Sequence, residues 1–349
     1  MHWLPEALDA RFANRSCRPG VTDCALAGDV AGYPGKQLAK HVANILILSH
    51  FVRSMNTERP PSIDPMAAAR WARHLPAESP WLHEEVARRM EDRLQWIVRT
   101  PASWTHWSPL QGGQRVHEQL VRRYPKALSF VREETPAQVK LAQQHLQQSW
   151  WRPARWLQPG VQFDAPEQPV QMLWANMALH MDADPQALIQ RWHGALEVDG
   201  FLMFSCLGPD TLRELRMVYE SLGWAPPSHA FTDMHDWGDM LVHAGFAEPI
   251  MDMEHITLSY STGETLLAEL RGLGRNLHID RFPGLRGRNW RRALSDALER
   301  QLKGPDGRLT LTFEVIYGHA FKPVARMPVR PETRVSLDEL RQSLRKIKP

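Results

Sequence analysis

The most constraining feature of the sequence is an alternation of short apolar runs with longer amphipathic runs in its middle third. The short runs have the length and composition of buried strands, and the longer runs have the apolar spacing of helices. The strand-like runs are 127–131, 170–176 and 200–205, and the helical runs are 136–149 and 185–196. Strands that alternate with helices of about 10–15 residues are typical of a mostly parallel sheet with helices on both faces. The sequence therefore predicts the α/β class.

Capping residues mark where several of these helices begin and end. Asp184 precedes Pro185, which is the favoured order of an N-cap and a first helical residue. Asp233 begins another predicted helix, and Gly245 stands where a C-terminal glycine belongs. The sequence Ser261-Thr-Gly-Glu264 has the spacing of a capping box. Further helices are expected over 66–73, 81–98 and 116–124.

The last third of the chain has a different pattern. Two strands are expected at 255–260 and 308–321, the second with apolar and polar residues in alternation. A helical insertion at 261–307 separates them. We expect the first strand, the insertion and the second strand to close the domain.

The ends of the chain have the composition of loosely structured segments. We expect one domain over 62–323, a flexible basic tail over 324–349 and a poorly ordered extension over 1–61. The extension scatters Cys, Gly and Pro without a helix or strand period, and Met55 precedes a Pro-rich stretch. We therefore expect Met55 to be the natural start.

Composition excludes several classes of protein. The chain has 349 residues, is 43% hydrophobic and 23% charged, and carries a formal net charge of +3, so it is neither a disordered chain nor a strongly basic nucleic-acid binder. Three cysteines cannot form a disulfide framework, which favours a reducing compartment and predicts a cytoplasmic protein. The longest apolar run, 43–52, is about half the ~20 residues that a membrane helix needs. We expect neither a nucleic acid nor a membrane as partner.

Several runs of residues resemble a known family. Trp174 to His180 and Gly200 to Arg216 look like the fourth and fifth strands of S-adenosylmethionine-dependent methyltransferases, and more specifically of the malonyl-[acyl-carrier protein] O-methyltransferases of biotin synthesis. The runs 231–246 and 313–323 are similar to a later helix and the last strand of that family, and 79–90 to its first helix. The resemblance implies a seven-stranded Rossmann-type sheet with an antiparallel last strand and a helical lid. It also implies S-adenosyl-L-methionine as cofactor, and an acyl-carrier protein or a small acyl thioester as partner.

The resemblance is least complete at the turn after the first strand. The family has an Asp and a glycine-rich turn there, whereas this chain has Trp104-Thr-His-Trp-Ser-Pro-Leu-Gln-Gly-Gly113. His106 stands in place of the Asp, and we expect Gly112 and Gly113 to retain contact with the cofactor. If Trp104 and Trp107 instead fill the cofactor's space, the chain is a non-catalytic relative that binds a carrier protein or another partner.

Three further residues are candidates for contact with the cofactor. Glu133 follows the second strand, where an acid accepts the ribose hydroxyls, although it could equally be a helix-entry acid. Asp164 has the place of the residue that holds the adenine amino group, although it could be an ordinary loop Asp. Asn176 ends a strand and either lines the site or only caps that strand.

The implied chemistry needs positioning rather than a base. A malonyl carboxylate is ionised at neutral pH and already nucleophilic, so no general base and no catalytic side chain is expected. The substrate's charge calls for a cation, and the arginine-rich insertion offers Arg281 and Arg288 to the carboxylate and to an acidic carrier protein. A solvated arginine face is the other interpretation.

One cluster of residues has the composition of a metal site but not its spacing. The residues are Asp233, His235, Asp236, Asp239 and His243. Because Asp233 and Asp236 belong to a helix start and the other three share one helix face, we expect a capped helix with a polar side and no metal. The sequence gives no prediction of oligomeric state.

Overall fold

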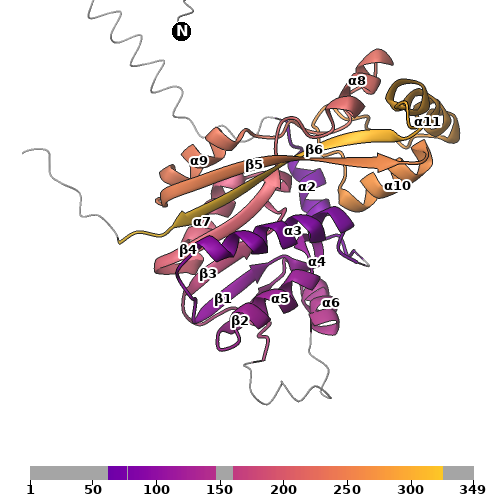
Figure 1. The fold of residues 1–349 in the computed structure, drawn as a ribbon. Coiled ribbons are helices and arrows are strands. Elements are labelled where there is room, and N and C mark those ends of the chain that lie inside the picture. Colours follow the sequence, from indigo (N-terminus) through magenta and orange to yellow (C-terminus); the bar gives the residue numbers. More distant parts are fainter. Residues whose placement is uncertain (1–61, 77, 147–159, 325–349) are drawn as a thin grey trace, which may run out of the picture. The chain divides into compact units, whose positions relative to one another are not determined.

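The computed structural model describes residues 62–76, 78–146 and 160–324 (Figure 1). The chain divides into two compact units, Met1–Thr57 and Glu58–Pro349, and every described residue belongs to the second. The predicted extension over 1–61, its proposed start at Met55, and all of the predicted tail except Val324 lie outside the described residues. None of the described helices is both long and apolar enough to cross a membrane.

A single mixed sheet organises the described unit. Its strands are β1 (Ser103–Trp107), β2 (Leu128–Arg132), β3 (Val170–Ala175), β4 (Leu196–Leu207), β5 (Ala247–Tyr260) and β6 (Leu309–Phe321). Their order is β2-β1-β3-β4-β6-β5. The first four in this order are parallel, while β6 runs antiparallel to both β4 and β5. The predicted α/β class and antiparallel last strand are confirmed.

The expected seventh strand is reduced to a single bridge. Among the described residues the sheet has six strands, and Gln162 pairs with Phe130 beside β2 as an isolated parallel bridge. The Gln162 amide donates to the Ser129 carbonyl, and the Gln162 carbonyl accepts from the Val131 amide, both at 2.8 Å. Pro166 follows closely, and a proline has no N–H with which to extend a ladder. The predicted count of seven was therefore wrong by one strand.

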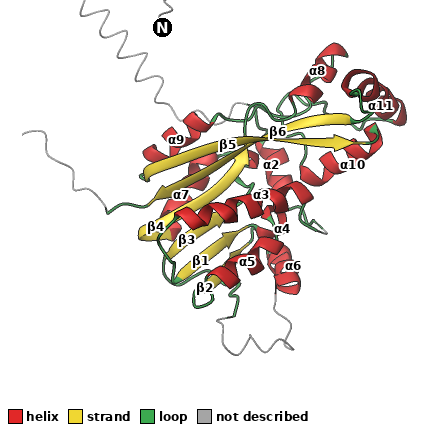
Figure 2. Cartoon of the chain, in the orientation of Figure 1, coloured by secondary structure: helices red, strands yellow, loops and turns green. Residues whose placement is uncertain are grey.

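Helices cover both faces of the sheet (Figure 2). Alternate β3 side chains point to opposite faces, so that Met172 and Trp174 pack with α3 and α5, while Leu173 and Ala175 pack with α7 and α9. The helices are α2 (Pro65–Ala72), α3 (Trp81–Arg93), α4 (Pro109–Gly112), α5 (Arg115–Arg123), α6 (Pro136–Leu146), α7 (Pro185–Ala195), α8 (Arg213–Ser221), α9 (Met234–His243), α10 (Gly263–Leu273) and α11 (Arg288–Leu302), with 3₁₀ turns at Leu94–Trp96 and Leu179–Met181.

Local capping explains where several helices begin. Asp184 accepts the Ala187 amide at 3.1 Å and Asp233 accepts the His235 amide at 2.8 Å, as the sequence predicts. The capping box of α10 is formed by Thr262 and Thr265 rather than by Ser261 and Glu264. The prediction was wrong by one residue because a threonine hydroxyl at the third helical position replaces the expected carboxylate.

The helical insertion between β5 and β6 is fastened to the start of the described chain. Helices α10 and α11 form the insertion, as predicted, and the loop between them passes α2. Ile63 and His278 form an antiparallel bridge, and the Asp64 amide donates to the Leu277 carbonyl at 2.8 Å. Leu277 is buried with Ile63 and Trp71 in a small core of its own. This contact holds α2 beside the carboxyl ends of the parallel strands.

Candidate functional site

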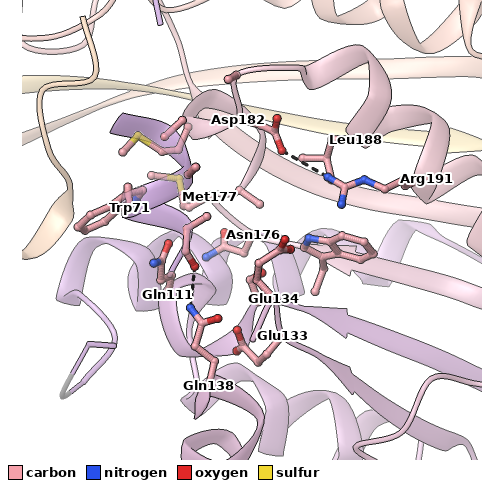
Figure 3. A pocket seen from close by; sticks show the side chains of 18 of the residues that line it. Trp71, Gln111, Glu133, Glu134, Gln138, Asn176, Met177, Asp182, Leu188 and Arg191 are labelled. Atoms are coloured by element: carbon pink, nitrogen blue, oxygen red, sulfur yellow. Dashed lines mark hydrogen bonds and ion pairs between the residues drawn. The ribbon is translucent and has the colours of Figure 1, made fainter. Parts of the chain in front are cut away.

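A cavity of about 250 Å³ lies where β1, β2 and β3 end (Figure 3). The chain leaves β1 toward β2 on one side and later returns to β3 on the other, and ligands bind in the crevice that such a reversal creates. The lining residues come from the three strand ends, from α2, α4, α6 and α7, and from the 3₁₀ turn Leu179–Met181 with the residues after it. They include Trp71, Trp107, Ser108, Gln111, Glu133, Glu134, Gln138, Asn176, Met177, Asp182, Leu188 and Arg191.

Glu133 links this cavity to a neighbouring hollow. Its carboxylate accepts the Leu110 amide at 2.9 Å, and burial raises the pKa of Glu133 to about 7. Glu133 also lines a second cavity of about 60 Å³, together with Asp164 and Phe163. The structure therefore brings together two of the predicted cofactor residues, Glu133 and Asp164, although the sequence separates them.

Asn176 both ends β3 and lines the large cavity. Its side-chain amide donates to the His83 carbonyl at 2.8 Å and to the Gly112 carbonyl, and its Oδ1 accepts from the Ser205 hydroxyl at 2.6 Å. All its polar side-chain atoms are thus engaged within the protein. Asn176 therefore positions the turn after β1, and its contact with a ligand would be mainly van der Waals contact.

The two predicted glycines pack against protein, and neither is among the residues that line the cavities. A Cβ added to Gly112 would lie 2.7 Å from the Asn176 carbonyl oxygen, so only glycine allows this close approach. Gly113 has a φ of +114° and lies against Ala87 of α3. Gln111, one residue earlier, is the part of this turn that faces the cavity.

The turn after β1 is a short helix rather than an open glycine loop. Ser108 has a φ of +51°, a conformation that glycine adopts at much lower cost. The α4 turn follows at once, and the Leu110 side chain is fully buried against Val131, Ala142 and Leu146. Apolar packing therefore fills the space beneath the turn.

His106 belongs to a buried histidine pair. Its Nδ1 lies 3.2 Å from Nδ1 of His117 on α5, and the two rings stack at 5.4 Å between centroids. Burial lowers the pKa of His117 to about 4 and that of His106 well below its usual value, so both are neutral at pH 7. The Nε2 atoms of both rings are buried and have no partner in the described part of the chain.

The two tryptophans of β1 have different roles. Trp104 is fully buried with α3 and α5 on the side of the sheet away from the cavity lining. Trp107 lines the cavity and makes an edge contact with Trp192 of α7. Of the two tryptophans, only Trp107 is therefore placed where it could fill the cofactor's space.

The polar side chains that line the two cavities fit a nucleoside with a positively charged end. Glu133 and Asp164 are acceptors, as ribose hydroxyls and an adenine amino group require. Glu134 and Asp182 add carboxylates to the large cavity, where Arg191 pairs with Asp182 at 3.5 Å. Sequence reasoning did not select Glu134 or Asp182, although both follow predicted strands at this edge of the sheet.

Arg281 and Arg288 lie on the insertion rather than in the cavity. Arg281 pairs with Asp64, the N-cap of α2, at 2.6 Å and donates to the His278 carbonyl at 3.0 Å. This hydrogen bond and charge lower the pKa of Asp64. Arg288 is exposed in the first turn of α11. The structure does not bring the two guanidinium groups together with Glu133 and Asn176.

The histidines and aspartates near Asp233 form local contacts. His235 Nδ1 lies 2.6 Å from Asp233 Oδ1, and His243 Nδ1 donates to the Asp239 carbonyl at 2.7 Å. These contacts belong to the cap and one face of α9. They are the contacts of a capped helix with a polar side.

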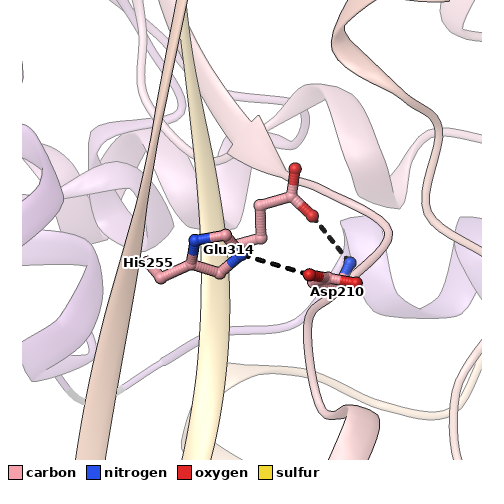
Figure 4. A group of neighbouring side chains, drawn as sticks. All are labelled: Asp210, His255 and Glu314. Atoms are coloured by element: carbon pink, nitrogen blue, oxygen red, sulfur yellow. Dashed lines mark hydrogen bonds and ion pairs between the residues drawn. The ribbon is translucent and has the colours of Figure 1, made fainter. Parts of the chain in front are cut away.

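Another group of possible ligand atoms lies at the end of β4 (Figure 4). Asp210, His255 and Glu314 place one ligand atom each within 4.8 Å of one another. Glu314 accepts the Asp210 amide at 2.7 Å, and a Cβ on Gly208 would lie 2.5 Å from its carboxyl carbon. Burial, with Glu314 nearby, raises the pKa of the Cys206 thiol. The group therefore orders the loop after β4, and Cys206 is a buried strand residue.

Comparison with known proteins gives close relatives in sequence. A malonyl-[acyl-carrier protein] O-methyltransferase of Gallionella capsiferriformans is 37% identical over 263 residues, which cover 70% of this chain and 86% of that protein. The protein of the same name from Laribacter hongkongensis is 37% identical over 254 residues and is covered to 84%. No family model matches the chain. Among solved structures, the YcgJ protein of Bacillus subtilis aligns with a TM-score of 0.46 at 11% sequence identity. The alignment covers 68% of this chain and 99% of that protein.

Proposed function

The chain belongs to the malonyl-[acyl-carrier protein] O-methyltransferase family, and from this premise we propose that it methylates the terminal carboxylate of an acyl group on acyl-carrier protein, in biotin synthesis. The observation that carries the proposal is the 37% identity over 86% of a relative of that name. The cavity at the carboxyl ends of β1, β2 and β3 supports it. The proposal places the reaction in the cytoplasm, in keeping with the cysteine count.

In this proposal S-adenosyl-L-methionine, when bound, supplies the methyl group. Glu133 accepts the ribose hydroxyls and Asp164 the adenine amino group. Asn176 holds the turn of Gly112 and Gly113 against β3. The carboxylates of Glu134 and Asp182 favour a cationic ligand in the cavity.

The remaining duties are to orient the substrate and to exclude water. A carboxylate is nucleophilic when ionised, so the proposal assigns neither a general base nor a metal ion to the reaction. Helix α2 lines the cavity with Pro65, Ala68 and Trp71 and covers it with apolar surface. Arg281 and Arg288 offer positive charge to the carrier protein, and Arg281 also fastens α2 through Asp64.

The altered turn after β1 favours a second candidate function. Ser108, the buried Leu110 and the His106–His117 pair replace the open glycine turn of the family. A chain of this kind could keep the fold and bind a carrier protein without catalysis. Cofactor binding distinguishes the two candidates.

The first test is calorimetric titration of S-adenosylmethionine and S-adenosylhomocysteine into the full chain. Micromolar binding, about −8 kcal/mol, followed by mass-spectrometric detection of a methyl ester on malonyl-carrier protein, is the expected result. Glu133→Gln and Asp164→Asn should each weaken cofactor binding by about tenfold. Glu167→Gln, a neighbouring acid outside both cavity linings, is the control. Absence of binding at millimolar ligand in folded protein favours the non-catalytic candidate.

The arginine assignment has its own test. A double variant, Arg281→Gln with Arg288→Gln, should weaken carrier-protein binding at low salt. Because Arg281 also pairs with Asp64, the single Arg288→Gln variant separates loss of charge from loosening of α2. Unchanged binding of the double variant would contradict the assignment.

A further inference from the structure

Arg286 lies in a cage of three aromatic rings on the loop between α10 and α11. Its guanidinium carbon is 4.3 Å from the ring centroid of Phe282, 4.7 Å from that of Trp290 and 5.5 Å from that of Trp224. The Trp224 and Trp290 rings are themselves 5.5 Å apart, and Tyr219 packs edge-on against Trp224. Rings on several sides hold a planar guanidinium in one orientation.

The charge of this guanidinium has no partner among the residues that the structure describes. Three other arginines of the insertion have partners, whereas Arg288 and Arg292 are exposed. Arg281 pairs with Asp64 at 2.6 Å, Arg291 lies 3.3 Å from Glu264, and Arg275 donates to the Gly274 carbonyl at 2.8 Å. The contacts of the Arg286 side chain are with the three rings, and its N–H groups donate no hydrogen bond to a described residue.

The surroundings of the cage add further donors. Helix α11 begins two residues later, and its N-cap, Gly287, provides no side-chain acceptor for the first amides. The Trp290 Nε1–H is buried without a partner in the described chain. Arg288 adds an exposed positive charge. Free N–H groups and positive charge at one place are suited to an oxyanion.

The cage also has a connection to the candidate active site. The first half of its loop is fastened to α2 by the Ile63–His278 bridge and by the Arg281–Asp64 pair. Helix α2 lines the large cavity. A ligand bound at Arg286 therefore contacts the same insertion that holds the cover of the cavity.

We propose that Arg286 and its aromatic cage bind an oxyanion of the carrier-linked substrate, which is either the phosphate of the carrier's prosthetic arm or the terminal carboxylate of the acyl group. The proposal rests on the proposed function. A caged arginine gives a bidentate contact to either group, and its orientation is fixed before binding.

The test compares Arg286→Gln and Arg286→Lys with a matched control, Arg292→Gln, which removes one charge from α11 outside the cage. Methyl-ester formation is measured on malonyl-carrier protein and on malonyl-pantetheine, which has no phosphate. Arg286→Gln should raise KM about tenfold or more with kcat little changed, and Arg286→Lys should recover only part of the loss. The control should stay near wild type.

The pattern across substrates identifies the oxyanion. A higher KM for both substrates assigns the carboxylate, and a higher KM for the carrier substrate alone assigns the phosphate. Unchanged KM for both, or an equal effect of Arg292→Gln, would overturn the proposal. If the wild type forms no ester at all, the proposed function fails separately. The site is then judged by titration of malonyl-carrier and of the armless carrier, where Arg286→Gln must weaken only the first.

Discussion

The two halves of the sheet are built differently. Strands β1, β2 and β3 are parallel and only 5, 5 and 6 residues long, whereas β4, β5 and β6 have 12, 14 and 13 residues and antiparallel pairing. The short half ends in the cavity and carries the strained Ser108. The long half has close side-chain packing across β4 and β6 and supports the insertion. The comparison indicates that ligand binding and rigidity are assigned to different halves.

Buried polar groups sharpen this difference. Three consecutive β1 residues, Trp104, Thr105 and His106, each have a buried side-chain polar atom without a partner in the described residues. In the long half, the Tyr260 hydroxyl and the His319 Nε2 also lack a partner among these residues, but they are isolated along their strands. Other side chains there are paired, since Tyr317 donates to Glu254 at 2.7 Å and Thr312 donates to Glu214 at 2.5 Å. An unpaired buried polar group costs stability, and such costs concentrate where function needs them. We therefore expect the two halves to respond to different perturbations.

The largest effect is expected from Gly318→Ala in β6. A Cβ there would lie 2.1 Å from Cε1 of Phe204, on the paired strand β4, and a fully packed ring cannot move away. The free energy of unfolding should fall by about 3 kcal/mol or more, measured by urea denaturation. Gly194→Ala in α7, where nothing lies within 4 Å, is the control and should not destabilise. A loss below about 1 kcal/mol at Gly318 would mean that the long half is not rigid.

A smaller effect is expected in the short half on acidification. The pKa of His117 is about 4 when folded, below its usual value of 6.5, so the unfolded chain binds protons first as the pH falls. The contribution of His117 to stability should be constant above pH 7 and decrease between about pH 6.5 and 4, with about 2 kcal/mol lost at pH 5. Glu133, whose folded pKa of about 7 lies above its usual value, contributes with the opposite sign, so the His117 contribution is read from the difference between variant and wild type.

A double variant tests this assignment. His106→Phe with His117→Leu replaces both partners by apolar groups and should reduce the slope of unfolding free energy against pH. His83 and His229, whose pKa values burial also lowers to about 4, should preserve part of the slope. An unchanged slope in the double variant would show that the pair does not control acid sensitivity.

The smallest effect is expected at Ser108. A non-glycine residue at a φ of +51° costs about 1–2 kcal/mol, and a glycine would avoid this cost. Glycine also increases the conformational entropy of the unfolded chain, and this offsets part of the stabilisation. Ser108→Gly should therefore raise the free energy of unfolding by about 1 kcal/mol or less. Gly113→Ala, at a φ of +114°, should change it in the opposite direction. Thermal unfolding of both variants and of the wild type checks whether the two changes in stability have opposite signs.

The sequence predicted the parts of the fold that have strong local signals. Helices α7 and α9 begin at the predicted caps because an Asp side chain accepts the first amides. Helix α8 had no expected counterpart, since it follows Leu212 at a φ of +59° and has no side-chain cap. The seventh strand was overcounted because the family pattern, rather than the residues near Gln162, suggested it.

The candidate site was predictable only in part. Glu133 and Asn176 were selected because they follow strands, and both line the cavity. The cover by α2, the contact of Trp224 with the aromatic cage and the role of Asp182 depend on contacts between segments far apart in the chain. No local pattern encodes those contacts. The partner of His106 likewise lies on another element, so its pairing with His117 could not be read from the strand alone.

The bridge between Ile63 and His278 has a consequence for the order of folding. Most of the described chain separates the two residues, so their contact has a high loop-closure cost and forms late. During synthesis α2 emerges before every strand of the sheet, yet its partner loop is made only after β5. The α2 cover therefore lacks this fastening in the nascent chain until the insertion is made, although Gln138 can already hold its end through the Ala72 and His74 carbonyls.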